Sequence, residues 1–370
     1  MFSCIGTSNT VFAKSAQAIL SVKSDSELSL YLFSGDIPKS ATEYAKNYFA
    51  SLTVFELLDL GFTQWEIDNL RLAPGVTAYE YTKCDAPFYY FPVVDESKII
   101  AIMTLIDYGD DVYSAQFGKS GFADSLNEIK TSVNEPVVLI IAQEGMYALD
   151  ASNNFILLDA FIVGKSNLSQ GYNLSVPNIT FNQVISYNNV EIAISEETKF
   201  DETIQYPTLR NVEENYIGVP FVGNLPNGVC WASSVASLIR ARIYLPITAT
   251  QLRDLILSNS SNTGTDNNIK AIIDSYVGGS STISTTRPTF SIVKTQIDNG
   301  KPIYSHWKTL PSLPYVGHAM VVRGYYSFTG PTSIIRISLM DPNKTSYQTV
   351  DPGGSYIVGP HILTWQTAVY

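Results

Sequence analysis

Asn224-Leu-Pro-Asn-Gly-Val-Cys230-Trp-Ala-Ser-Ser-Val-Ala-Ser-Leu-Ile239 is the stretch that decides how the rest of this 370-residue chain is interpreted. A loop of Gly, Pro and Asn leads directly into a cysteine, and apolar side chains then follow at helical spacing, as at Val235, Leu238 and Ile239. A cysteine at a helix N-terminus lies near unpaired backbone N–H groups and the positive end of the helix dipole. Both stabilise a thiolate, which is the nucleophilic form of cysteine. The stretch therefore predicts a reactive cysteine at the start of a helix.

Two stretches further along the chain supply a base and an acid for this cysteine. Gly317-His318-Ala-Met-Val-Val reads as a strand that begins with a histidine, and Ile334-Ile-Arg-Ile-Ser-Leu-Met-Asp341 reads as a strand that ends with a carboxylate. Imidazole can take the proton of a thiol, and a carboxylate can hold the imidazole in the required tautomer. We therefore predict Cys230 as nucleophile, His318 as base and Asp341 as orienting group.

Other side chains are alternatives for the same roles. The chain has three histidines, so His306 and His361 compete with His318 for the role of the base. Asn343 competes with Asp341 as the residue that orients the imidazole. A free cysteine considered alone is more often a buried structural thiol. The catalytic interpretation therefore depends on the loop, the helix and the downstream histidine taken together.

The order of these residues resembles that of papain-like cysteine peptidases, which have Cys, then His on a strand, then Asp or Asn at the end of the next strand. The sequence Gly-Val-Cys-Trp at 228–231 is similar to the Gly-Ser-Cys-Trp of that family. The spacings, 88 residues from Cys230 to His318 and 23 more to Asp341, resemble those of its compact bacterial branch, the staphopain-like and bacteriocin-leader peptidases. The resemblance covers roughly residues 210–370. It implies helices packed on an antiparallel sheet and hydrolysis of peptide bonds by a thiolate.

One position departs from the pattern of that family. The family has Gln six residues before the cysteine, where its amide binds the oxyanion, and this chain has Asn224 there. Asn carries the same amide on a shorter side chain, so we expect Asn224 to bind the oxyanion, with Asn227 as the alternative. Loss of one oxyanion donor costs about a hundred- to a thousand-fold in rate. Weakened catalysis is therefore also compatible with this departure.

The composition excludes several classes of protein. Charged residues are 15% of the chain and the net charge is −11, with no basic stripe, which argues against nucleic acid as a partner. The cysteines Cys4, Cys84 and Cys230 form no CxxC motif, disulfide framework or zinc-finger spacing, so we predict no metal and no other cofactor. No apolar run is long enough to span a bilayer. A surface rich in Asn, Ser, Thr and Tyr is common in secreted bacterial proteins, so we expect a secreted or cell-surface bacterial protein.

The patterning divides the chain into four parts, and the predicted fold class is α+β. Residues 1–25 are expected to be an N-terminal tail, either the remnant of a secretion signal or a segment without structure. Residues 26–165 have helical patterns and then apolar runs separated by turns, which predicts an α+β domain that resembles a pro-domain. Residues 166–215 predict a linker, and residues 216–370 a papain-like domain.

Three functions are compatible with this sequence. The first is a cysteine endopeptidase made as a proenzyme, whose partner is a protein or peptide substrate and whose N-terminal domain acts as an intramolecular inhibitor until the linker is cut. The second is a transglutaminase or amidase, since the same thioester can deliver its acyl group to an amine. The third is a binding protein on a peptidase scaffold, which the presence of Asn224 leaves open. For the N-terminal domain, the rival interpretation is a permanent accessory domain that recruits substrate.

Overall fold

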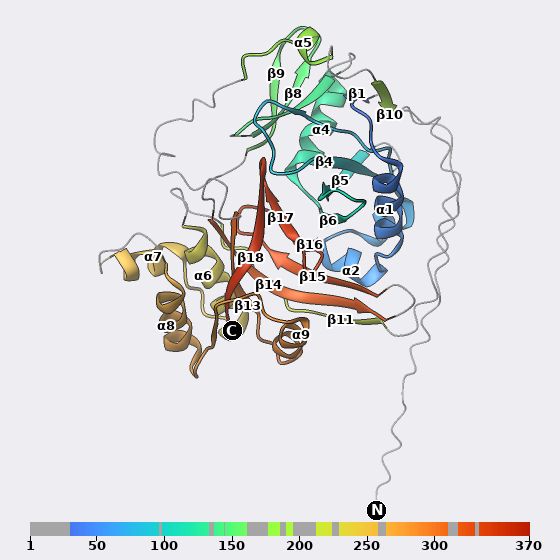
Figure 1. The fold of residues 1–370 in the computed structure, drawn as a ribbon. Helices are drawn as coiled ribbons and strands as arrows, with labels where there is room; N and C mark the ends of the chain where they lie inside the picture. The colour runs from blue at the N-terminus through green and yellow to red at the C-terminus, as the bar shows by residue number, and fades with distance from the viewer. Residues whose placement is uncertain are drawn as a thin grey trace, which may run out of the picture.

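The computed structural model describes residues 30–95, 98–132, 137–143, 145–160, 177–185, 190–194, 212–223, 229–257, 264–309, 317–329 and 333–370. In this part of the chain, helices pack against one six-stranded and one twelve-stranded β-sheet, and most of the strand pairs are antiparallel (Figure 1). The α+β fold class that the sequence predicts is confirmed. The predicted N-terminal tail lies outside the described residues.

The N-terminal half, before residue 161, contains most of the six-stranded sheet and one end of the twelve-stranded sheet. Its elements are β1 (Leu30–Ser34), α1 (Lys39–Ala50), α2 (Val54–Asp59), α3 (Gln64–Asn69), β2 (Leu70–Leu72), β3 (Tyr79–Glu80), β4 (Phe88–Asp95), β5 (Lys98–Asp107), β6 (Tyr113–Gly118), α4 (Gly121–Ser132), β7 (Val137–Ile141), β8 (Gly145–Asp150) and β9 (Phe155–Ala160). Within the segment predicted as a linker, the structure describes α5 (Phe181–Ile185) and β10 (Val190–Ile194). Strand β10 pairs antiparallel with β1, at the edge of the six-stranded sheet.

The C-terminal half, from residue 212, has its helices first and most of its strands after them. Its elements are β11 (Val212–Tyr216), α6 (Cys230–Ile243), α7 (Ala249–Leu257), α8 (Asp266–Val277), β12 (Ile283–Ser284), α9 (Phe290–Asp298), β13 (Ile303–Thr309), β14 (Gly317–Phe328), β15 (Ile334–Met340), β16 (Gln348–Val350), β17 (Ser355–Val358) and β18 (His361–Val369). Helices α6, α7 and α8 share one hydrophobic core with β13, β14 and β18. This is the arrangement of helices on an antiparallel sheet that the papain-like resemblance implies.

Threonines set the start of four of these helices. Thr53, Thr63, Thr265 and Thr289 precede α2, α3, α8 and α9, and each hydroxyl accepts the backbone N–H three residues ahead. Such a cap satisfies one of the N–H groups that the first turn of a helix leaves unpaired. The boundaries of these helices are therefore set by local sequence.

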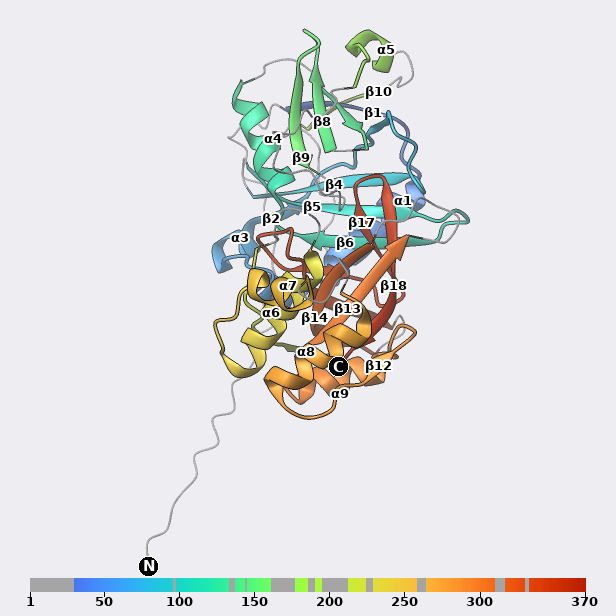
Figure 2. The same cartoon turned by 90° about the vertical axis from the view of Figure 1, so that its left-hand side faces the viewer.

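The twelve-stranded sheet runs through both halves of the chain. Its strand order is β12-β18-β13-β14-β15-β16-β6-β5-β4-β2, with β11 beside β14 and β17 beside β18. The two halves meet where β16 pairs antiparallel with β6, with Thr349 opposite Phe117 and Val350 opposite Gln116. In Figure 2, β4, β5 and β6 lie above most of the C-terminal half, and the β17–β18 hairpin rises to their level. Backbone hydrogen bonds therefore join the halves into one continuous sheet.

Two buried ion pairs lie close to this junction. Arg336 of β15 is fully buried and donates from Nε and Nη2 to the two carboxylate oxygens of Glu56 in α2, at 2.8 and 2.6 Å. Arg323 of β14 donates from Nη2 to Asp59 Oδ1 at 2.6 Å. Removing one partner of a buried ion pair is strongly destabilising because the other charge is left unpaired. Helix α2 is therefore fixed to the sheet of the C-terminal half.

No helix among the described residues is long and apolar enough to cross a membrane. No group of three or more His, Cys, Asp or Glu side chains in the same residues is arranged to hold a metal ion.

Candidate active site

The cysteine that the sequence singles out is the first residue of α6. Residues 231–239 of this helix are all buried, and many of them are Ala or Ser, which allows the neighbouring strands to approach closely. Ser234 Oγ donates to the carbonyl of Ala319 in β14 at 2.8 Å, next to His318. Small side chains and this hydrogen bond thus place the start of the helix beside the start of β14.

Hydrogen bonds also hold the segment that leads to the cysteine. Ser233 Oγ donates to the carbonyl of Gly223 at 3.1 Å, and Ser237 Oγ accepts the backbone N–H of Val222 at 3.1 Å. The helix begins after Val229, and among the described residues no side chain caps it. In this part of the structure, no capping side chain from residues 221–223 or 229 occupies the N–H groups of the first turn, which suits a site where an anion develops.

His318 and Asp341 lie together, as the sequence predicts. His318 Nε2 lies 2.7 Å from Asp341 Oδ1, and the two residues are 4% and 1% exposed. A hydrogen bond to Cys230 also acts on the His318 ring. Since Nε2 is taken by Asp341, Nδ1 is the ring nitrogen left for the thiol. The structure therefore brings the three predicted catalytic residues together in one site.

The charges in this site support one another. Burial lowers the pKa of His318, but the Asp341 carboxylate and the contact with Cys230 outweigh it and raise that pKa to about 10. Burial raises the pKa of Asp341, but His318, the Tyr356 hydroxyl and the Asn343 backbone N–H together lower it to about 2. At neutral pH, the site therefore holds an imidazolium paired with a carboxylate, and the Cys230 sulfur lies beside the ring.

The competing histidines have other partners. Burial, with a smaller effect from Lys308, lowers the pKa of His306 to about 4, and its Nδ1 lies 4.0 Å from Asp266 Oδ1. His361 Nδ1 lies 3.6 Å from Asp85 Oδ2, a residue of the N-terminal half. Neither contact involves Cys230 or Asp341, so the geometry favours His318 as the base.

Of the alternative residues for orienting the ring and binding the oxyanion, the structure describes only Asn343. Asn343 contributes its backbone N–H, which donates to Asp341 Oδ1 at 2.8 Å, while the His318 ring contacts the Asp341 carboxylate. Asn224 and Asn227 lie outside the described residues. Their assignment to the oxyanion therefore stays a prediction.

One residue of this site is not predicted from the sequence. Tyr356 of β17 is fully buried, and its hydroxyl donates to Asp341 Oδ2 at 2.5 Å. Its ring lies 6.3 Å from the His318 ring and 6.1 Å from that of Trp307, measured between centroids. No motif could have identified it, because a tyrosine in a short apolar strand is ordinary.

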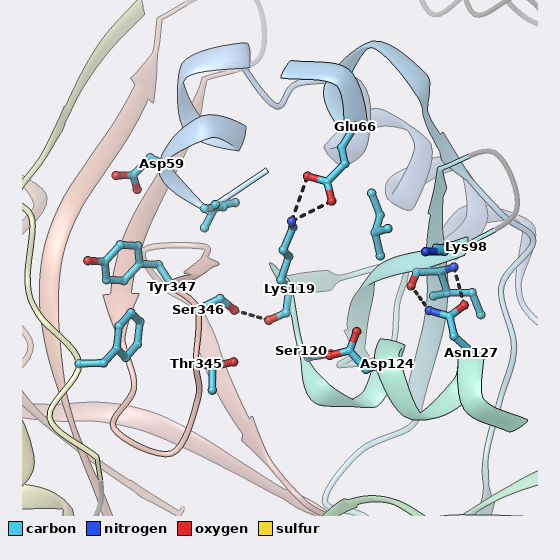
Figure 3. A pocket seen from close by; sticks show the side chains of 15 residues that line it. Asp59, Glu66, Lys98, Lys119, Ser120, Asp124, Asn127, Thr345, Ser346 and Tyr347 are labelled. Atoms are coloured by element: carbon cyan, nitrogen blue, oxygen red, sulfur yellow. Dashed lines mark hydrogen bonds and ion pairs between the residues drawn. The ribbon is translucent and has the colours of Figure 1, made fainter. Parts of the chain in front are cut away.

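Two cavities lie between the halves of the chain. The larger, of about 420 Å³, is lined by α2, α3, β5 and α4 on one side and by Phe221 and residues 345–347 on the other (Figure 3). Lys119 crosses it, with Nζ 2.9 Å from Glu66 Oε1 and its carbonyl accepting the Ser346 hydroxyl. The predicted catalytic residues do not line this cavity, so it is not the candidate active site.

The smaller cavity, of about 90 Å³, lies behind the carboxylate of the site. Asp341, Lys344 and Tyr356 line it from the C-terminal half, and Gln116 and Asp159 are among the residues that line it from the N-terminal half. The N-terminal half therefore reaches the immediate surroundings of the predicted orienting group.

Comparison with known proteins adds one finding to this geometry. A search of curated proteins gives no match to the chain. A scan against protein-family models gives a match over residues 216–357, less than half of the chain, and this stretch contains Cys230, His318 and Asp341. The match supports a cysteine peptidase, a hydrolase of the papain-like type, in the C-terminal half. Residues 216–357 are similar to the Peptidase_C39 like family.

Proposed function

We propose that this protein is a cysteine endopeptidase with Cys230 as nucleophile, His318 as base and Asp341 as orienting group. The observation that supports it most is the 2.7 Å contact between His318 Nε2 and Asp341 Oδ1, in a site where the same ring contacts a cysteine that begins a helix. A histidine–carboxylate pair with a purely structural role would not require a thiol next to the imidazole ring.

The geometry supports the following sequence of steps. In the free enzyme, His318 takes the proton of the Cys230 thiol, which gives a thiolate beside an imidazolium, and this thiolate attacks the carbonyl carbon of the scissile peptide bond. The backbone N–H of Cys230 and the side-chain amide of Asn224 bind the resulting oxyanion. His318 then donates its proton to the leaving amine, and a thioester with Cys230 remains. Water, deprotonated by His318, hydrolyses the thioester and regenerates the thiol. Asp341 keeps the ring oriented throughout.

The experiment is digestion of casein in the presence of a reductant by the protein, both intact and after its linker has been cut, with Cys230→Ala as the control. Mass spectrometry of the products counts new N-termini. We expect new N-termini with the parent protein and none above background with Cys230→Ala. A product that carries a new amide between chains, without new N-termini, would show acyl transfer instead. Cleavage by Cys230→Ala at the rate of the parent would refute the proposal.

We further propose that the protein is a secreted bacterial proenzyme in which the N-terminal half stays bound to the peptidase half. Secretion rests on the surface composition. The inhibitory role is the sequence-based prediction, and the continuous sheet and buried ion pairs favour a form of it in which this half stays attached. A cut between Ile194 and Val212 would then leave two fragments that remain together.

Limited proteolysis followed by size-exclusion chromatography tests this part. We expect the two fragments to elute as one species, and activity on a short peptide to rise after the cut if the N-terminal half also inhibits. Unchanged activity in a complex that stays together would leave the permanent accessory domain as the better description. Separate elution of an active C-terminal fragment would instead identify a removable pro-domain.

A further inference from the structure

We propose that Tyr356 is a positioning residue of the catalytic carboxylate, and that the N-terminal half holds the strand that carries it. The proposal rests on the proposed function, because it concerns the same site. It assigns to the N-terminal half a part in assembling the active site, which differs both from inhibition and from recruitment of substrate.

Asp341 accepts hydrogen bonds at both of its carboxylate oxygens. Its Oδ1 accepts from His318 Nε2 at 2.7 Å and from the backbone N–H of Asn343 at 2.8 Å, and its Oδ2 accepts from the Tyr356 hydroxyl at 2.5 Å. A carboxylate this deeply buried needs donors for both oxygens. A hydroxyl that donates to a carboxylate forms one of the stronger hydrogen bonds in proteins. Tyr356 therefore fixes the rotation of the carboxylate and keeps Oδ1 facing the imidazole.

Tyr356 acts only as a hydrogen-bond donor to Asp341. Burial, the nearby charge of Asp341 and the hydrogen bond to it all raise the pKa of Tyr356 well above its usual value. The hydroxyl therefore keeps its proton over the range in which peptidases work, and it can donate but not accept from Asp341. Its ring also lies near those of Trp307 and His318, at 6.1 and 6.3 Å between centroids. Two ring contacts thus add to the hydrogen bond in holding this side chain.

Strand β17, which carries Tyr356, contacts the N-terminal half. Strand β17 pairs with β18 on one side. On the other side, the residues before and after Tyr356 bind the N-terminal half: Ser355 Oγ contacts the Tyr108 hydroxyl, and the Ile357 N–H donates to Gln116 Oε1 at 2.9 Å. These bonds place Tyr356 between two contacts with the N-terminal half.

A second contact holds the turn between β17 and β18. Asp85 Oδ2 accepts the backbone N–H of Ile362 at 2.9 Å, and the backbone N–H of Asp85 donates to the Pro360 carbonyl at 3.0 Å. Asp85 belongs to the N-terminal half, between β3 and β4. The hairpin that carries Tyr356 is therefore fixed at its strand and at its turn by residues more than two hundred positions earlier in the chain.

Besides His318, the charged side chain of Lys344 faces Asp341. Lys344 acts electrostatically on Asp341, and its Nζ lies 3.0 Å from Asp159 Oδ2 in β9 of the N-terminal half. The charged and titratable groups around the carboxylate are therefore His318, Lys344 and Tyr356. Because Asp159 pairs with the ammonium, Asp341 is left to the imidazole and the phenol. The N-terminal half thus acts on the site through Gln116, Tyr108, Asp85 and Asp159.

The test compares Tyr356→Phe with Tyr48→Phe in the full-length protein. Tyr48 is also buried, and its hydroxyl has no hydrogen-bond partner among the described residues, so its loss is a matched control for removing a buried phenol oxygen. We expect Tyr356→Phe to lower kcat by about ten- to a hundred-fold with KM nearly unchanged, since a hydrogen bond to a charged group is lost. We expect Tyr48→Phe to behave like the parent.

The pH dependence separates positioning from general destabilisation. Tyr356 helps to lower the pKa of Asp341, so without its hydroxyl the carboxylate should take up a proton at a higher pH. As the pH falls, Tyr356→Phe should therefore lose activity earlier than the parent. The rate of Cys230 alkylation by iodoacetamide, followed over the same pH range, should show the same shift. A variant that is only less stable would lose amplitude without a shift.

A second variant tests the support from the N-terminal half. Gln116→Met keeps the size of the side chain and removes the oxygen that accepts the Ile357 N–H. We expect the same direction of change as for Tyr356→Phe, with a smaller loss of kcat. Near-ultraviolet circular dichroism shows whether each variant is folded.

Each outcome separates this inference from the proposed function. An active parent with an inactive Cys230→Ala, together with parental kcat, pH profile and alkylation profile in Tyr356→Phe, would overturn the inference and leave the peptidase standing. If the parent cleaves no peptide, the proposed activity fails, and the alkylation profile still decides whether Tyr356 acts on the site. A shift in Tyr356→Phe without any change in Gln116→Met would overturn the role of the N-terminal half.

Discussion

Two buried charge pairs lie at opposite ends of β15, and they have different partners. His318 is near the start of β14 and Asp341 directly follows β15, while Arg336 lies near the other end of β15 and pairs with Glu56. All three nitrogens of the Arg336 guanidinium donate to acceptors, namely to Glu56 and to Ser51. His318 has one ring nitrogen bound to a carboxylate and a thiol beside the ring.

This difference separates a pair that joins parts of the fold from one that can perform chemistry. The guanidinium carbon of Arg336 lies over the Tyr326 ring, 4.1 Å from its centroid, and each guanidinium nitrogen has an acceptor. A guanidinium also keeps its proton under all ordinary conditions. The imidazole of His318 can give up a proton and has a thiol as partner. Substitutions should therefore affect activity at one pair and stability at the other.

The largest effect is expected at the imidazole. His318→Ala should lower kcat by roughly ten-thousand-fold, because members of a catalytic triad act as a unit. His306→Ala, in the neighbouring strand, is the control and should leave kcat close to that of the parent. Steady-state cleavage of a fluorogenic peptide measures both. An equal loss from His306→Ala would mean that the base lies on β13.

The next effect is expected at the guanidinium. Arg336→Met should lower the free energy of unfolding by about 3–5 kcal/mol, because Glu56 is left charged and unpaired in a buried site. The double variant Arg336→Met/Glu56→Leu should recover much of this loss. Urea unfolding measures stability, and kcat per folded molecule should stay near the parental value. A loss below about 1 kcal/mol would place this pair with exposed ion pairs, which contribute little.

The oxyanion donor comes third. Asn224→Ala should lower kcat by about a hundred- to a thousand-fold with little change in KM, since an oxyanion donor acts mainly in the transition state. Asn224→Gln, which restores the amide that the resembling family has, should be active. Initial rates at saturating peptide separate the two variants. Unchanged kcat in Asn224→Ala would direct attention to Asn227.

The smallest effect is a pH dependence of stability that only one pair should show. The pKa of His318 is raised to about 10 in the folded state, so its stabilisation is present below its unfolded value of 6.5 and is lost as the pH rises from there towards 10. The pKa of Asp341 is lowered to about 2, so its stabilisation is present above 3.8 and is lost as the pH falls towards 2. The melting temperature of the parent should therefore fall as the pH rises above 6.5, and the melting temperature of His318→Ala should not show this alkaline decline. An identical decline in both proteins would assign it to other groups.

The sequence predicts the site better than it predicts the connection between the halves. Thiol, imidazole and carboxylate are the residue types that this chemistry requires, and their order along the chain already indicates the strands that bring them together. The cysteine helix and the strands of His318 and Asp341 were predicted for this reason. The pairing of β6 with β16 joins Gln116 to Val350, and nothing local in either strand indicates its partner.

Some of what was missed left a signal in the sequence. Arg323 and Arg336 each interrupt an apolar strand, in Val-Val-Arg-Gly and Ile-Ile-Arg-Ile, and a buried arginine implies an acidic partner. That signal predicts an ion pair but not that Asp59 and Glu56, more than two hundred residues earlier, provide it. Tyr356 had no comparable signal. Its position depends on a hairpin that both halves hold.

Covalent labelling with a peptidyl epoxide tests the central claim most directly, because it requires both a nucleophilic thiol and a peptide-binding site. The protein, in reductant, is incubated with the epoxide, and intact mass and peptide mapping locate the adduct. We expect one adduct on Cys230 in the parent and none in His318→Ala, although this variant keeps the same thiol. An adduct on Cys84 or Cys4, or labelling of Cys230 that is equally fast in His318→Ala, would contradict this claim.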